Sequence, residues 1–139
     1  MDVIAEVPGW TQATSVNVKL FDLQHQHLFQ LIDRLETEIS GGKGRDKMVE
    51  FLAHIADYAA EHFATEESVM RAYEFPWRDA HAQEHRKLTA MVAKFRAQEE
   101  SGDAALSVTI MRGLRKWILW HVQGTDRLYT EFLNSRGFC

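Results

Sequence analysis

Residues 48–70 read MVEFLAHIADYAAEHFATEESVM, and their apolar side chains recur at alternating steps of three and four residues. That spacing places them on one stripe of an α-helix, because a helix completes a turn every 3.6 residues. The same stripe carries His62 and Glu66 toward its carboxyl end. The segment therefore predicts a long amphipathic helix whose buried face includes side chains able to bind a metal ion.

Three other segments show the same periodicity: residues 25–39, 81–95 and 111–128. Glycine, proline and serine mark breaks at residues 41–44, 73–76, 101–103 and 135–137, and no segment alternates with a period of two. Short connections between long helices make neighbours run antiparallel. The sequence predicts an all-α, up-down-up-down four-helix bundle at residues 19–135. Residues 1–18 lack helical periodicity and are predicted to form an extended N-terminal arm of the same domain.

The composition of the chain argues against several classes of function. A chain of 139 residues with 45% hydrophobic and 26% charged residues suits one globular domain. A net charge of −4 without a basic cluster argues against a nucleic-acid partner. The single cysteine, Cys139, cannot form an internal disulfide, and no stretch approaches the roughly 20 apolar residues of a membrane span. We expect a cytoplasmic protein without a membrane span.

Every predicted helix carries imidazole on its apolar stripe. His62 and Glu66 are four residues apart, about 40° around a helix, so they project from one face, as do His81 and His85. In alternating helices, positions early in the first and third lie level with positions late in the second and fourth. Seven side chains are predicted to meet in one layer on this basis: His25, His62, Glu66, His81, His85, His121 and Asp126.

A single pair of histidines spaced by four residues is usually a surface feature, and so is a His–Glu pair. The joint occurrence in four helices is what indicates a metal site. Imidazole and carboxylate without thiolate suit iron, zinc or manganese. Seven ligands are too many for one tetrahedral ion and fit two metals joined by bridging carboxylates.

Four short motifs resemble those of the hemerythrin family, particularly its bacterial single-domain members. They are DLQH at 22–25, HFATEE at 62–67, HAQEH at 81–85 and HVQGTD at 121–126. The resemblance runs from about Trp10 to Tyr129 and implies two iron ions with an oxo or hydroxo bridge. One iron would be held by His81, His85 and His121, and the other by His25 and His62. Glu66 and Asp126 would bridge both, dioxygen would bind at the second iron, and Ile118 would line its pocket.

Three further residues carry expectations about local structure. His121 and Asp126 would point about 140° apart on an ideal helix, which predicts a distortion such as a π-bulge near Gly124. Asn17 stands where many relatives have glycine and is expected to tolerate left-handed backbone. Trp120, a bulky neighbour of His121, is expected to pack between helices.

The resulting hypothesis is a non-enzymatic protein that reversibly binds dioxygen for storage, delivery or sensing, with an oxygen-consuming enzyme or a signalling protein as a partner in trans. The alternative is a di-iron enzyme acting on nitric oxide, peroxide or ferrous iron. Oxygen-activating bundles usually carry Glu-x-x-His repeats, which this chain lacks. A third hypothesis is a zinc or metal-buffering protein. The sequence leaves the oligomeric state open.

Overall fold

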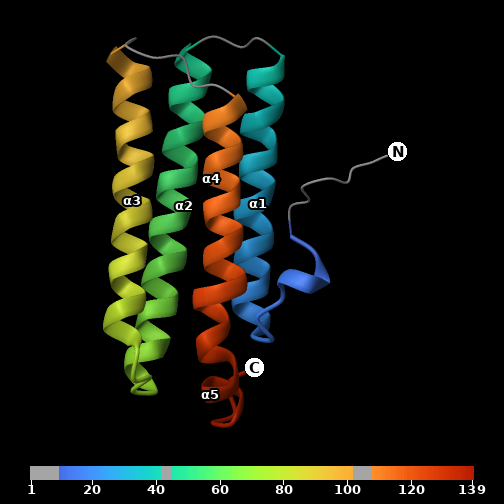
Figure 1. Cartoon of the computed structure of the whole chain (residues 1–139), viewed down its shortest axis with the longest axis vertical. Coiled ribbons are helices and arrows are strands. Elements are labelled where there is room, and N and C mark those ends of the chain that lie inside the picture. Colours follow the sequence, from blue (N-terminus) through green and yellow to red (C-terminus); the bar gives the residue numbers. More distant parts are fainter. Residues whose placement is uncertain (1–9, 42–44, 102–107) are drawn as a thin grey trace.

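The computed structural model describes residues 10–41, 45–101 and 108–139. Four long helices lie side by side, each antiparallel to the next along the chain (Figure 1). No strand occurs among the described residues. The predicted all-α, up-down-up-down bundle is therefore confirmed. Its helices are α1 (Lys19–Ser40), α2 (Arg45–Ala72), α3 (Arg78–Ser101) and α4 (Val108–Trp120).

The end of the fourth helix departs from α geometry. The π-helix η2 (His121–Thr125) follows α4 directly, and then come the 3-10 helix η3 (Asp126–Tyr129) and the short helix α5 (Thr130–Asn134). The predicted distortion near Gly124 is thus present as a π-helical turn. A π turn accommodates one residue more than an α turn, so residues five apart can lie on one face of the helix. His121 and Asp126 are both buried as a result.

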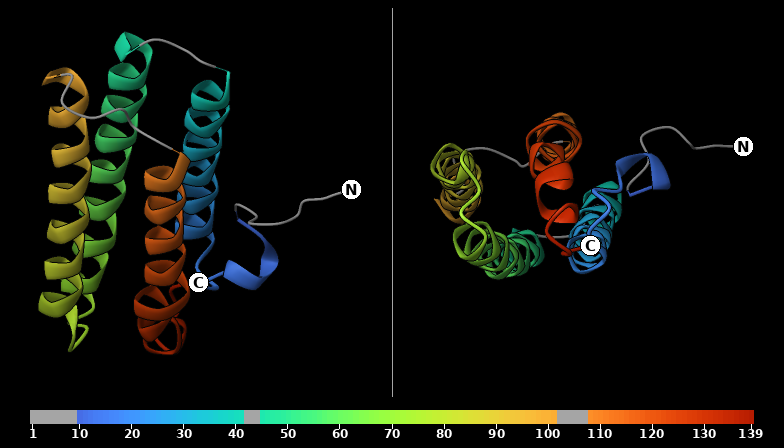
Figure 2. Two further views of the ribbon diagram at one scale, coloured as in Figure 1. Left: turned by 45° about the horizontal axis from the view of Figure 1, so that its top comes forward. Right: turned by 90° about the horizontal axis from the view of Figure 1, so that it is seen from below.

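The described part of the predicted arm, residues 10–18, packs against the outside of the bundle beside α1 (Figure 2). Its described part contains a 3-10 turn, η1 (Gln12–Thr14), and then buries Val16 and Val18. Asn17 between them has a φ of 54°, as expected for a position that favours glycine. The hydroxyl of Thr130 donates to the carbonyl of Val16 at 2.8 Å and ties the arm to α5. Residues 1–9 of the predicted arm lie outside the described residues.

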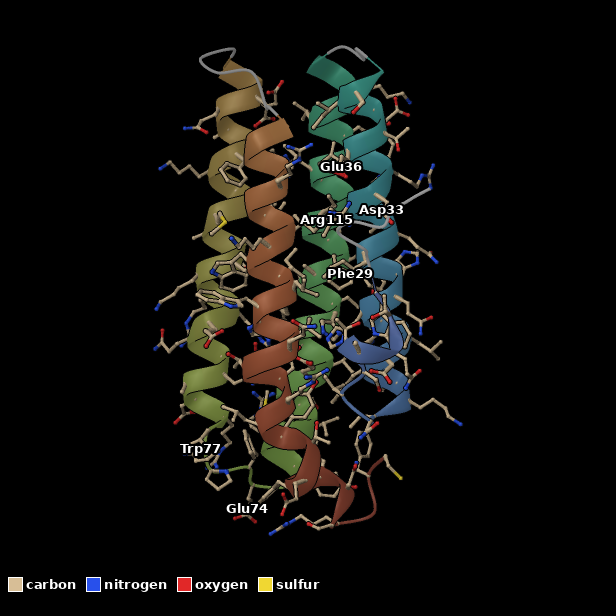
Figure 3. The ribbon with its side chains drawn as sticks, turned by 45° about the vertical axis from the view of Figure 1, so that its right-hand side comes forward. Phe29, Asp33, Glu36, Glu74, Trp77 and Arg115 are labelled. Carbon is tan, nitrogen blue, oxygen red and sulfur yellow. The ribbon has the colours of Figure 1, made fainter. Side chains whose placement is uncertain are left out.

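The interior is filled by apolar side chains from all four helices. Among the described residues, Arg115 of α4 is a buried cation: it is 4% exposed and reaches across to Asp33 and Glu36 on α1 (Figure 3). None of the described helices combines the length and the apolar composition that crossing a membrane requires. The fully buried large side chains are Tyr129, Phe21, Phe29, Phe75, Ile32, Leu35, Leu52, Ile55, Met70, Leu88 and Leu114.

Candidate metal centre

Seven buried side chains meet near the end of the bundle at which α1 and α3 begin. They form two groups of potential metal ligands, within each of which the ligand atoms lie within 4.8 Å of one another. Glu66 and Asp126 belong to both groups. The first group adds His81, His85 and His121, and the second adds His25 and His62.

The two carboxylates face both groups with different oxygen atoms. Asp126 Oδ1 lies 2.8 Å from His81 Nε2 and 3.0 Å from His121 Nε2, whereas its Oδ2 lies 3.1 Å from His25 Nε2. The two carboxylate oxygens of Glu66 also face different groups. Its Oε1 lies 3.1 Å from His85 Nε2, and its Oε2 lies 3.4 Å from His62 Nε2. Each carboxylate therefore offers one oxygen to each side, which is the geometry of a bridging ligand between two ions.

The inward atoms of the cluster lack hydrogen-bond partners. Nε2 is buried without a hydrogen bond in His25, His81, His85 and His121, and so are Glu66 Oε1 and both carboxylate oxygens of Asp126. Buried polar atoms normally find partners, because an unpaired one costs free energy. Imidazole and carboxylate donors with their lone pairs turned to a common centre fit one or two transition-metal ions.

The outward nitrogens of three imidazoles, by contrast, are hydrogen-bonded, and each acceptor comes from the preceding helix. His62 Nδ1 of α2 meets Gln24 Oε1 of α1 at 2.5 Å. His85 Nδ1 of α3 meets Glu67 Oε2 of α2 at 2.7 Å. His121 Nδ1, at the start of η2, meets Glu84 Oε1 of α3, also at 2.7 Å. An acceptor at Nδ1 holds the proton there and leaves Nε2 free to bind a metal.

Aromatic rings fix the orientation of the imidazoles. The ring of Phe63 stacks on His85 at a centroid distance of 3.9 Å, and Trp117 stacks on His121 with an interplanar angle of 6°. The ring of Tyr129 stacks on His81, and its hydroxyl donates to Glu66 Oε2 at 2.6 Å. Tyr129 thus holds a carboxylate of the cluster and one of its imidazoles together.

In the metal-free protein, the imidazoles and carboxylates of the cluster stabilise each other's charged forms. Burial lowers the pKa of His25 and His81, but the nearby carboxylates of Asp126 and Glu66 outweigh it, because they stabilise the protonated imidazoles, and raise these values to about 9 and about 10. Burial favours the neutral form of Asp126 and Glu66, yet the surrounding imidazoles hold the pKa of both carboxyls below the ordinary range. A divalent cation would supply the same positive charge in place of these protons.

The structure brings together all seven residues predicted from the sequence. Their role as metal ligands stays a prediction, as does that of Ile118, which is buried one turn before His121. The expectation for Trp120 is wrong: its side chain is 75% exposed, because it points outward from α4 while its neighbour His121 points inward.

Gln24 and Tyr129 were not predicted from the sequence to be partners of the cluster. Gln24 lies within the quoted motif DLQH, so its position beside His25 was a usable signal. Glu67 and Glu84 likewise lie inside the quoted motifs. A helical stripe cannot show which of these polar side chains reaches the neighbouring helix, because that depends on how the helices are rotated about their axes.

Comparison with known proteins agrees with this geometry. A family model described as the hemerythrin HHE cation-binding domain matches residues 16–133, a range that contains the whole cluster. The bacteriohemerythrin of Methylococcus capsulatus is 29% identical over 127 residues, which cover 91% of this chain and 96% of that protein. The bacteriohemerythrin of Campylobacter jejuni is 31% identical over 122 residues, covering 88% and 92%. A crystal structure of wild-type hemerythrin has a TM-score of 0.84 at 28% identity and covers 91% of this chain and 97% of that one. The chain therefore belongs to the hemerythrin family.

Proposed function

We propose that this protein reversibly binds dioxygen at a non-haem di-iron centre, for storage, delivery or sensing. Hemerythrins hold a di-iron centre, and this chain has a buried cluster of the matching composition. The proposal rests on the two carboxylates of the cluster. Glu66 and Asp126 each turn one oxygen toward each group of imidazoles. When bound, a di-iron centre can lend two electrons to dioxygen and recover them on release.

The two sides of the cluster are unequal. Counting one atom from each residue, the group with His81, His85 and His121 offers five donor atoms, and the group with His25 and His62 offers four. An external ligand finds more room where the protein supplies fewer donors. We assign dioxygen to the side of His25 and His62, with Ile118 as a wall of its pocket.

The protein surroundings suit a reversible ligand. Of the five imidazoles in the cluster, His121 is the most exposed at 6%, and both carboxylates are fully buried, so bulk water has little access. Five imidazoles with only two carboxylates leave less negative charge at the centre than a glutamate-rich shell does, which favours reversible binding over strongly oxidised states. The hydrogen bond from Tyr129 to Glu66 holds one bridging carboxylate in place.

The test is an absorption experiment on iron-loaded protein. The protein is reduced without oxygen, dioxygen is admitted while the visible spectrum is recorded, and dioxygen is then removed. We expect a ligand-to-iron charge-transfer band that appears with dioxygen and disappears on its removal. A band that decays irreversibly would contradict reversible binding and favour an enzyme acting on nitric oxide, peroxide or ferrous iron. A protein that takes up iron and shows no band would overturn the proposal.

A pair of variants on α2 tests the assignment of the dioxygen side. His62→Ala should lose the reversible band and retain the helical circular dichroism. His54→Ala is the matched control, because His54 lies two turns earlier on the same helix and is exposed. It should behave as the unsubstituted protein does. Reversible binding that survives in His62→Ala at full amplitude would refute the assignment.

A further inference from the structure

A surface recess of about 600 Å³ lies between α3 and the end of α4. Its lining includes Glu84 and Lys87 of α3, Trp117 and Trp120 of α4, and His121 and Gln123 of η2. A volume of this size is in the range of small-molecule sites. The recess therefore reaches one residue of the metal cluster, His121, from the solvent side.

Two indole rings supply the flat surfaces of the recess. Trp120 is the most exposed of the large hydrophobic side chains that the structure describes, at 75% of its surface. Trp117 is half-buried, and its ring lies parallel to that of His121 at a centroid distance of 5.5 Å. Exposed aromatic side chains beside a hollow are typical of binding sites, because stacking on a ligand recovers the free energy of removing the ring from water.

The lining contains one acidic side chain, Glu84, and one basic side chain, Lys87. Glu84 is engaged by His121 Nδ1 and by the hydroxyl of Thr125, which donates to both its carboxylate oxygens at 2.9 and 2.8 Å. Lys87, one turn later on α3, has no ion pair within the described part of the chain. A Cβ atom built on Gly124 would meet nothing within 4 Å, so the floor on the η2 side is open. The recess thus combines a lysine side chain that has no ion pair among the described residues with unfilled space beside two indole rings.

We propose that this recess binds a planar aromatic anion, whose ring stacks on Trp120 and whose negative group lies near Lys87. The ring would also approach Trp117. Because Trp117 stacks on His121, a bound ligand would change the surroundings of the His121 ring. Binding itself does not depend on a metal, whereas any effect on the dioxygen site rests on the proposed function. A small molecule is favoured over a protein surface because the indoles lie at a hollow, which a flat partner would leave unfilled.

Flavin mononucleotide is the probe, because it joins a three-ring planar system to a phosphate. It is titrated into the metal-free full chain, with binding followed by quenching of flavin fluorescence and checked by equilibrium dialysis. Aromatic stacking of a base contributes about 1–3 kcal/mol, which corresponds to a roughly 5-fold to 150-fold change in affinity. We expect Trp120→Ala to weaken binding by at least about 5-fold. Trp77→Ala is the matched control, because Trp77 is 57% exposed and does not line the recess; it should bind as the unsubstituted chain does.

Riboflavin, which lacks the phosphate, separates stacking from charge. It should bind more weakly than flavin mononucleotide, and Lys87→Gln should weaken the mononucleotide about 2-fold to 5-fold while leaving riboflavin unchanged. In nuclear magnetic resonance spectra the probe should shift the ring signals of Trp117 and His121 and leave those of the exposed His27 in place.

Three results would overturn the proposal. The first is no binding of the probe at millimolar concentration, and the second is equal loss of affinity in the Trp120 and Trp77 variants. The third is a concentration-dependent dimer that Trp120→Ala abolishes, since a second copy of the chain would then occupy the recess. None of these measurements uses iron or dioxygen, so their failure is distinct from a failure of the proposed function.

Discussion

Removal of a single hydroxyl group tests whether Tyr129 holds the cluster in place. Tyr129 is fully buried, and its hydroxyl donates to Glu66 Oε2 at 2.6 Å. Burial and then the nearby carboxylates raise the pKa of the phenol well above its ordinary value, so it remains a donor at any working pH. Tyr129→Phe keeps the ring and removes one hydrogen bond to a charged group, an interaction that contributes about 1.5–3 kcal/mol. In a domain of this size about 2 kcal/mol corresponds to a fall in Tm of roughly 6–8 °C.

The assay compares Tyr129→Phe with Tyr73→Phe in the metal-free protein by urea denaturation, and both variants in iron-binding titrations. Tyr73 is a suitable control because it is partly buried and its hydroxyl has no hydrogen bond to any described residue. Tyr129→Phe should lower the free energy of unfolding by about 2 kcal/mol and weaken iron binding by about 10-fold to 100-fold, as loss of a group that orients a metal ligand typically does. Equal stability and equal iron affinity in the two variants would refute the role assigned to this hydroxyl.

Other substitutions and conditions give further tests. In the metal-free protein the raised pKa values of His25 and His81 should contribute stability fully below pH 6.5 and lose it as the pH rises through about 9 to 10, which denaturation at several pH values measures. Iron loading should remove this alkaline loss; the same loss in loaded protein would count against metal binding by these residues. Gly124→Ala should keep or raise the free energy of unfolding by up to about 1 kcal/mol, because its Cβ meets nothing within 4 Å. Arg115→Met should leave the free energy of unfolding nearly unchanged, because it removes the buried charge while the acids left behind, Asp33 and Glu36, remain partly exposed to water. A loss of more than about 2 kcal/mol in urea denaturation would show instead that this ion pair stabilises the fold.

The sequence was sufficient to predict the bundle, because four long stripes with a helical period admit few other arrangements. It also predicted the π-helical turn, since the spacing of His121 and Asp126 is incompatible with one face of an α-helix. The convergence of seven ligand-type residues followed from their heights along alternating helices. These are properties of spacing along the chain, which the sequence displays directly.

Side-chain direction at the bundle surface could not be predicted in the same way. Trp120 was expected to pack between helices on the basis of its size, but its position on α4 turns it to solvent. The pairing of Glu84 with His121 depends on how α3 and α4 are rotated relative to each other, and the periodicity of the sequence does not show this rotation. Tyr129 lies beyond the π-helical turn, which changes the phase of the stripe and conceals which residue faces Glu66.

The chain of acceptors from Gln24 to Glu84 has a consequence for the order in which the site can be assembled. Each hydrogen-bonded imidazole receives its acceptor only when the helix before it has docked, so no single helix contains a finished half of the centre. A nascent chain would complete these contacts from its first helix to its last. The final contact involves the π-helical turn. A chain that ended before residue 121 would lack His121 and Asp126, and it could not hold two metal ions in this way. Metal capture would therefore report on a completed fold rather than on a partial one.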